Sequence, residues 1–188
     1  MPKSKLQRIQ SEKHRMDIHR TTLRLATAAM FVALSVVIGM FCKTFLNFSG
    51  GLIRITFENL PIILSGIFFG PWVGGLVGTI ADLVSYLLSP QIYPPNLIVT
   101  FGAFSVGVIS GLVSRYVVRC HGVKQIIVSG AAAHIIGSMI IKSIGLYQFY
   151  QWGILFRIPL YLVIASLEIC LLCVLWNRAA FRRLLEKL

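Results

Sequence analysis

Acidic side chains are scarce in this chain of 188 residues, and charged residues of either sign are few. Six Asp and Glu stand against eighteen Lys and Arg; charged residues make up 13% of the chain and hydrophobic residues 56%. The mean hydropathy of +0.80 lies well outside the range of soluble globular domains. The composition therefore excludes a soluble domain and predicts an integral membrane protein.

Cysteine and the common catalytic motifs are also sparse or missing. The chain has four cysteines, of which Cys170 and Cys173 lie three positions apart in an apolar run, a pattern that matches neither a disulfide framework nor a zinc site. The sequence contains no G-x-x-x-x-G-K-[ST] phosphate loop, no H-E-x-x-H and no G-x-S-x-G. We therefore expect no metal, no cofactor, no enzymatic activity and no hydrolysis of ATP by this chain.

The formal net charge of +12 raises the question of nucleic acid. Most of the Lys and Arg residues, however, flank apolar runs, in the first 24 residues, in "SRYVVRCHGVK" and in "NRAAFRRLLEKL". Cytoplasmic loops of membrane proteins carry this excess of positive charge. The pattern indicates contact with the lipid bilayer and predicts no nucleic-acid binding.

Apolar stretches long enough to cross about 30 Å of hydrocarbon follow one another along most of the chain. They lie at about 23–42, 72–88, 97–118, 125–147 and 158–176, with a shorter one at 60–69. The short stretch leaves five and six crossings open, but six place both basic termini in the cytoplasm, as the positive-inside rule favours. We predict an all-α membrane protein, a compact bundle of six transmembrane helices over 22–177, between basic cytoplasmic segments at 1–21 and 178–188.

Small residues recur at a spacing of four, which lets membrane helices approach closely. These stripes are Ala29 and Ala33; Gly70, Gly74 and Gly78; Ala103, Gly107 and Gly111; and Ser129, Ala133 and Gly137. Most of them must pack inside the bundle. The spacing alone does not identify a stripe that faces another protein.

Ionisable residues inside the membrane cost about 2.5 to 3.5 kcal/mol each on insertion scales, so each is a functional candidate. Asp82 lies near the outer end of the third span, and His134 and Lys142 share a face of the fifth. Arg157 begins the sixth span from the outer side. We predict that these groups converge on one outward cavity. Three alternatives stay open: Asp82 pairs with Lys142 or Arg54, His134 is a core histidine, and Glu168 packs or forms an interhelical hydrogen bond.

The outer segments are rich in aromatic and cationic residues and nearly free of acidic ones, which suggests a lid over a site for a planar or anionic small molecule. Alternatively, their aromatic residues form the interfacial belt common in membrane proteins. Within "ENLP", Pro61 suits the first turn of a helix, and Glu58 or Asn59 can accept hydrogen bonds from its free amide groups. Arg54 is better placed to meet an anion or Glu58.

Residues 22–177 resemble the membrane-embedded substrate-binding (S) components of energy-coupling factor (ECF) vitamin transporters, above all the folate-specific ones. The likeness lies in "GLIRITFENLPIILSGIFFGPWVGGLVGTIADLVSYLLSP" and "YPPNLIVTFGAFSVGVISGL". The resemblance implies a prokaryotic plasma-membrane protein that binds one vitamin from outside and works with a transmembrane coupling subunit and two ATPases. It also implies that Ala29 and Ala33 dock on the coupling subunit.

Folate has a flat pteridine, a benzoyl linker and a glutamate tail with two carboxylates, and the sequence offers partners for each. The predicted ligand-binding residues are Arg54, Phe57, Glu58, Asn59, Asp82, Tyr86, Tyr93, His134, Lys142, Tyr147, Trp152 and Arg157. Their carboxylates can accept hydrogen bonds from the pteridine, their aromatic rings can stack on it, and their cations can meet the tail. The alternatives are an S component for another vitamin such as pantothenate, a stand-alone secondary transporter, and a membrane-embedded enzyme using acid or base chemistry.

Overall fold

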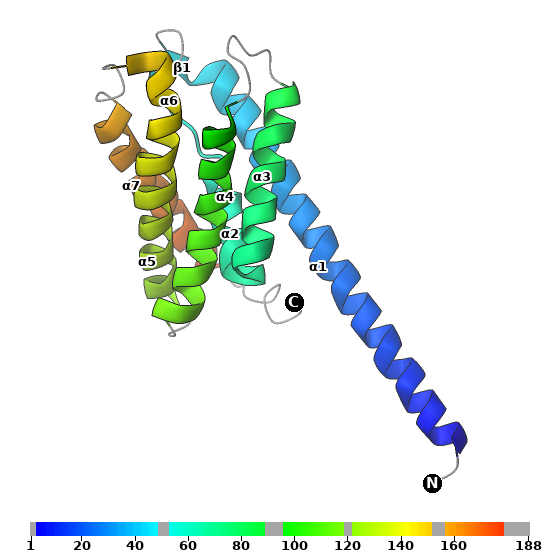
Figure 1. Ribbon diagram of the computed structural model, residues 1–188. Coiled ribbons are helices and arrows are strands. Elements are labelled where there is room, and N and C mark those ends of the chain that lie inside the picture. The colour runs from blue at the N-terminus through cyan, green and yellow to red at the C-terminus, as the bar shows by residue number, and fades with distance from the viewer. Residues whose placement is uncertain (1–2, 49–52, 89–95, 119–121, 152–156, 179–188) are drawn as a thin grey trace.

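The computed structural model describes residues 3–48, 53–88, 96–118, 122–151 and 157–178. Two of the predicted binding residues, Tyr93 and Trp152, lie outside these ranges. The elements are α1 Lys3–Phe45, β1 Asn47–Phe48, β2 Ile53–Arg54, α2 Asn59–Phe69, α3 Pro71–Leu88, α4 Leu97–Leu112, η2 Val113–Val117, α5 Val123–Ala133, η3 His134–Lys142, α6 Ser143–Tyr150 and α7 Arg157–Trp176 (Figure 1).

The helices pack into one bundle, as predicted for an all-α membrane protein (Figure 1). The π-helical segment η2 continues α4, and α5, η3 and α6 follow one another without a break. Over the described residues, five helices are long and apolar enough to cross a membrane. An addition to the prediction is a short antiparallel pair, β1 and β2, in which Asn47 lies opposite Arg54.

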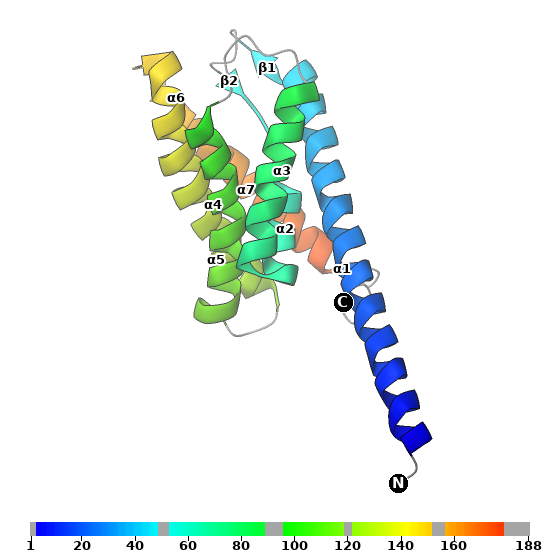
Figure 2. The same cartoon turned by 45° about the vertical axis from the view of Figure 1, so that its right-hand side comes forward.

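The short helix α2 lies at the centre of the bundle, which explains its length. It contacts α1, α3, α4, α5 and α7, and Figures 1 and 2 both show it among these helices. Every residue from Asn59 to Ile67 is buried. A helix wrapped by other helices buries its backbone in protein, so it does not need the length of a lipid-exposed span.

Three of the four small-residue stripes are packed inside the bundle. A methyl group on Gly107 would overlap the carbonyl of Gly74, and one on Gly78 would overlap the carbonyl of Ala103, so α3 and α4 touch backbone to backbone. On η3, Gly137 lies against Val106 of α4 in the same way. The fourth stripe, Ala29 and Ala33 on α1, is exposed.

The end of the bundle that holds the turn between α2 and α3 also holds basic side chains. Gly70 makes this turn with φ of 94°, a conformation that favours glycine. The Arg115 guanidinium lies over Gly70 and donates a 3.1 Å hydrogen bond to the Phe69 carbonyl. Helix α7 ends at the same level, where Trp176 stacks on Phe68. The opposite end carries β1, β2 and the start of α4 (Figure 2).

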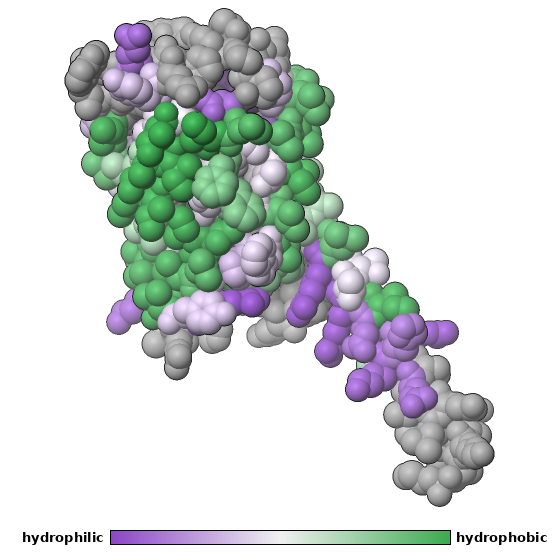
Figure 3. Space-filling view, viewed as in Figure 1, coloured by the Kyte–Doolittle hydropathy of each residue, from purple (hydrophilic) through white to green (hydrophobic). Residues whose placement is uncertain are grey.

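Helix α1 is much longer than the apolar stretch that predicted it. The helix begins at Lys3 and continues past the bundle (Figure 1). No Gly or Pro interrupts residues 3–38, and Lys, Arg, Gln and Glu all favour helices, so nothing stops the helix at the membrane boundary. Figure 3 shows the result: apolar side chains cover the bundle, and hydrophilic ones gather on the projecting part of α1.

Candidate functional site

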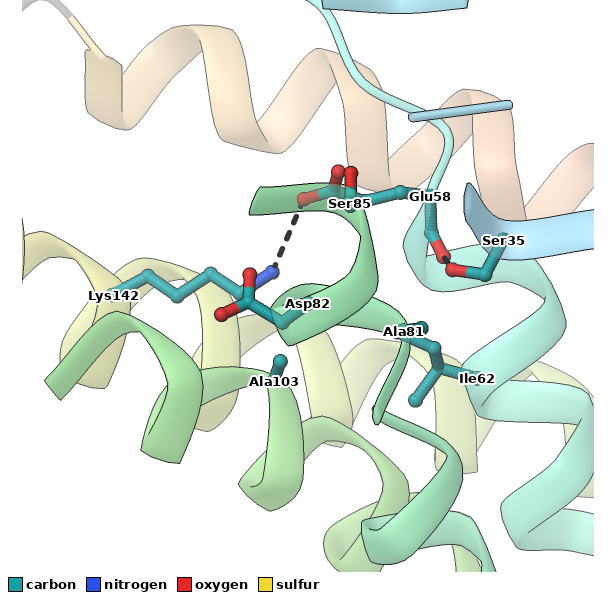
Figure 4. Close-up of a pocket in the computed structure, with 8 residues that line it drawn as sticks. All are labelled: Ser35, Glu58, Ile62, Ala81, Asp82, Ser85, Ala103 and Lys142. Carbon is teal, nitrogen blue, oxygen red and sulfur yellow. Dashed lines mark hydrogen bonds and ion pairs between the residues drawn. The ribbon is translucent and has the colours of Figure 1, made fainter. Parts of the chain in front are cut away.

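A polar pocket lies within the bundle, in its half nearer β1 and β2. It is lined by Ser35, Glu58, Ile62, Ala81, Asp82, Ser85, Ala103 and Lys142, which come from α1, the start of α2, α3, α4 and η3 (Figure 4). Three of these eight residues carry ionisable groups. The structure therefore brings Asp82 and Lys142 together, as predicted, and adds Glu58 to them, whereas His134 does not join them.

The Lys142 ammonium is held by two groups from the start of α2. Its Nζ donates a 2.9 Å hydrogen bond to Asn59 Oδ1 and lies 3.6 Å from Glu58 Oε1. Lys142 is only 6% exposed, so its charge is stable only because these partners replace water. Asn59 also donates a 3.5 Å hydrogen bond from Nδ2 to Ser138 Oγ, one turn before Lys142 on η3. The ion-pair partner of Lys142 over the described residues is thus Glu58 and not Asp82.

This arrangement corrects the interpretation of "ENLP" as a capping sequence. Glu58 stands at the N-cap of α2 but its side chain makes no capping hydrogen bond, and Asn59 turns toward Lys142. Both side chains point into the bundle because a buried ammonium binds them more strongly than the free backbone amides at the start of α2 would. Pro61 lies in the first turn of α2, as predicted.

Helix α1 contributes to the position of Glu58. Ser35 Oγ donates a 2.6 Å hydrogen bond to the Glu58 carbonyl oxygen. One turn further, a methyl group on Gly39 would lie 3.0 Å from Glu58 Oε2, so glycine leaves room for the carboxylate against the helix. The Glu58 side chain therefore enters the pocket beside the backbone of α1.

Helix α3 supplies the second carboxylate and a hydroxyl group. Asp82 Oδ2 accepts a 2.7 Å hydrogen bond from Thr100 Oγ1 of α4. One turn above it, Ser85 lines the pocket and accepts hydrogen bonds from Lys43 Nζ, 2.9 Å at Oγ and 3.1 Å at the carbonyl. These contacts leave Asp82 half-buried, with acceptor capacity toward the pocket.

His134 lies away from the residues that line the pocket. Its Nε2 is 2.7 Å from Glu168 Oε2 of α7, and Glu168 is completely buried. This contact between η3 and α7 gives Glu168 an interhelical packing role, which is part of one of the alternatives that the sequence left open. It also ties the helix that carries Lys142 to the last helix of the bundle.

The remaining predicted binding residues are spread around the same end of the protein. Phe57 precedes α2 and is half-buried, Tyr86 is half-buried one turn after Asp82, and Tyr147 on α6 is exposed. Arg54 belongs to β2 and Arg157 begins α7, but only their backbones are described. Among the side chains that the structure describes here, those of Phe57, Tyr86 and Tyr147 do not line the pocket.

Sequence reasoning missed several polar residues that line the pocket or contact its lining. Ser35 and Ser85 are isolated hydroxyl residues in apolar spans, and Thr100 lies in the span after Asp82. Hydroxyl residues are common in membrane helices, so their types give little signal. Lys43 follows the first apolar stretch directly, but only the folded chain shows that it reaches Ser85.

Comparison with known proteins gives three findings. Residues 23–181 match the family model "ECF transporter, substrate-specific component". The chain is similar to the folate transporter FolT of Clostridium novyi (strain NT), with 29% identity over 91 residues, which cover 48% of this chain and 52% of that protein. The chain thus spans about half the length of this curated relative.

The third finding concerns the fold. A crystal structure of FolT bound with folic acid resembles this chain with a TM-score of 0.59 and 22% identity, over 87% of this chain and 92% of that one. At this level of identity the likeness establishes a common fold. It agrees with the arrangement of helices around α2 described above.

Proposed function

This chain belongs to the family of substrate-specific components of ECF transporters, and on that premise we propose that it captures folate at the outer face of a prokaryotic plasma membrane for ATP-driven uptake. The energy comes from a separate module with a transmembrane coupling subunit and two ATPase subunits. This division of work accounts for a sequence without a phosphate-binding loop.

The observation that carries the proposal is the chemistry of the pocket. Glu58 and Asp82 offer carboxylate oxygens to the amino and ring N–H groups of the pteridine, which are donors. The Lys142 ammonium is already paired with Glu58, at 3.6 Å, and we assign it to the acceptor edge of the same ring system, in place of the tail carboxylates. Each charge-assisted hydrogen bond in such a shielded site contributes roughly 1.5 to 3 kcal/mol.

The chemistry of the pocket assigns it to one end of the ligand. Its two carboxylates and one ammonium complement the hydrogen-bond donors and acceptors of a pteridine. We therefore assign the pteridine to this pocket. The glutamate tail then extends toward the outer segments, where we propose that Arg54 and Arg157 meet its carboxylates and that Phe57, Tyr86, Tyr93, Tyr147 and Trp152 supply aromatic contacts.

We further propose six crossings with both termini in the cytoplasm. The central helix α2 counts as the second crossing, although it is shorter than the five membrane-length helices. Support comes from Arg115, Lys124 and Arg178, which lie toward the end of the bundle opposite β1 and β2. Positive charge gathered at one end is the arrangement expected on the cytoplasmic side.

The surface for the coupling subunit is proposed at Ala29 and Ala33. The other small-residue stripes are occupied by contacts between helices of the bundle, whereas these two alanines are exposed on α1. Small residues on a lipid-facing helix let a second membrane helix approach closely. This makes α1 the best candidate for contact with another membrane protein.

Titration calorimetry of folate against variants of the purified protein tests the assignment of the pocket. Asp82→Asn and Lys142→Gln should each weaken folate binding by at least about tenfold, or 1.4 kcal/mol. The matched controls Asp17→Asn and Lys124→Gln change the same residue types at exposed positions and should bind as the parent does. Unchanged binding in both pocket variants would reject the site, and tight binding of pantothenate by the parent would favour another vitamin.

A further inference from the structure

The N-terminal part of α1, residues 3–24, is here called the basic arm. The apolar residues 25–45 that follow it extend over about 31 Å as a helix, which alone crosses the hydrocarbon of a bilayer. The basic arm therefore continues the helix beyond the hydrocarbon. Figure 1 shows that it leaves the bundle obliquely and extends well past the other helices.

The described side chains in the middle of the basic arm are exposed. These are Gln10 and every residue at 12–23. A helix with little packing is marginal in water, because most helical stability in proteins comes from tertiary contacts. Over residues 12–23 the described bundle covers no face of the helix, which leaves this stretch open to a surface outside the bundle.

The charge of the basic arm indicates what that surface is. Seven Lys and Arg residues stand against only Glu12 and Asp17, and His14 and His19 add to the basic character. The arm has no continuous apolar face to insert into a membrane, because Met16 and Ile18 are two residues apart and so point to opposite sides of the helix. Its charge is therefore its dominant feature. An arm of this kind is complementary to a densely anionic surface and poorly suited to burial in acyl chains.

We propose that the basic arm docks on anionic phospholipid headgroups. Its C-terminal end lies directly at the hydrocarbon boundary, so Arg20 and the residues around it fall within about one Debye length, roughly 10 Å, of the headgroup charges. Docking holds the arm helical and orients α1, which also carries the exposed Ala29 and Ala33. The assignment to the cytoplasmic leaflet rests on the proposed function, whereas the lipid contact itself does not.

Hydrogen exchange of the full chain in nanodiscs, read by mass spectrometry, tests this contact. The nanodiscs contain phosphatidylcholine either alone or with about 30% phosphatidylglycerol in both leaflets, so the orientation of the chain does not affect the result. Amides of the basic arm should exchange at least tenfold more slowly with phosphatidylglycerol, and 0.5 M NaCl should remove most of this protection. Peptides from α2 should exchange equally in both lipids and serve as the internal reference.

Two variants separate charge from helix propensity. The triple variant Lys13→Gln, Arg15→Gln, Arg20→Gln should lose the lipid-dependent protection, whereas Lys13→Arg, Arg15→Lys, Arg20→Lys should keep it. Equal exchange of the arm in both lipids, or protection that appears only after a coupling subunit and ATPases are added, would overturn the proposal. Folate calorimetry on the same nanodiscs reports separately on the proposed function.

Discussion

Lys142 of η3 and Asn59 of α2 are joined by a 2.9 Å hydrogen bond from Nζ to Oδ1. This bond fixes a buried ammonium at the start of the central helix, 3.6 Å from Glu58 Oε1. Asn59 itself does not line the pocket. Its effect on a ligand therefore passes through Lys142, which makes it a positioning residue.

Asn59→Leu should destabilise the protein and weaken folate binding. The substitution leaves the Lys142 ammonium without its hydrogen-bond acceptor, and an unsatisfied buried polar group costs about 1 to 3 kcal/mol or more when charged. Unfolding by SDS titration in mixed micelles measures the loss of stability. Calorimetry should show folate affinity reduced by at least about tenfold.

The double variant Asn59→Leu, Lys142→Leu distinguishes stability from recognition. Removing both polar partners eliminates the unsatisfied charge, so much of the lost stability should return. Folate binding should remain weak because the ammonium is gone. If the double variant recovers folate affinity together with stability, Lys142 has only a structural role.

Glu168→Ala should be among the most destabilising substitutions of a polar residue in this chain. Glu168 is fully buried and lies 2.7 Å from His134, and leaving the buried imidazole without this partner costs about 1 to 3 kcal/mol. Replacing both residues with Leu should cost less. The exposed Glu12→Ala is the control, and an equal effect of Glu12→Ala and Glu168→Ala on SDS unfolding would show that the contact is unimportant.

Ala33→Leu should prevent recovery of the complex with the coupling subunit and ATPases but leave folate binding intact. A bulky side chain on the exposed stripe of α1 keeps a partner helix at a distance. Co-purification from membranes measures the complex. Ser166→Leu, at an exposed position of α7, is the matched control. A parallel loss of folate binding in Ala33→Leu would mean that the stripe serves the bundle itself.

Single cysteines in a cysteine-free background should report the proposed orientation. Asn47→Cys, in β1, should react with a membrane-impermeant maleimide added to intact cells, and Lys124→Cys, at the start of α5, should react only after the membrane is opened. The two positions lie at opposite ends of the bundle. Labelling of Lys124→Cys in intact cells would contradict the proposed six crossings with cytoplasmic termini.

The sequence predicted the helices well because hydropathy is a local property. Even the short apolar stretch at 60–69 matched α2. The helical form of the basic arm was missed, because hydropathy detects the membrane boundary and the helix does not end there. The π-helical segments carry no sequence signal comparable to that of an apolar run.

The sequence predicted some of the residues that form the site, but not the partners that they contact. The free-energy cost of placing an ionisable side chain inside the membrane identified Asp82 and Lys142 as candidates. The structure places both in one pocket. Which partner each selects depends on tertiary geometry: Asp82 meets Thr100, and Lys142 meets Asn59 and Glu58. Local pattern also favoured a capping role for "ENLP", where the fold places an ion pair.

The most direct test of the central claim is titration calorimetry of the purified parent protein in nanodiscs with folate, pantothenate, riboflavin and thiamine. We predict tight binding of one folate per chain and no measurable heat from the other three vitamins. A pocket with two carboxylates and a lysine complements a ring that carries both donors and acceptors. Tight binding of pantothenate, riboflavin or thiamine, or the absence of folate binding by a folded protein, would contradict this account.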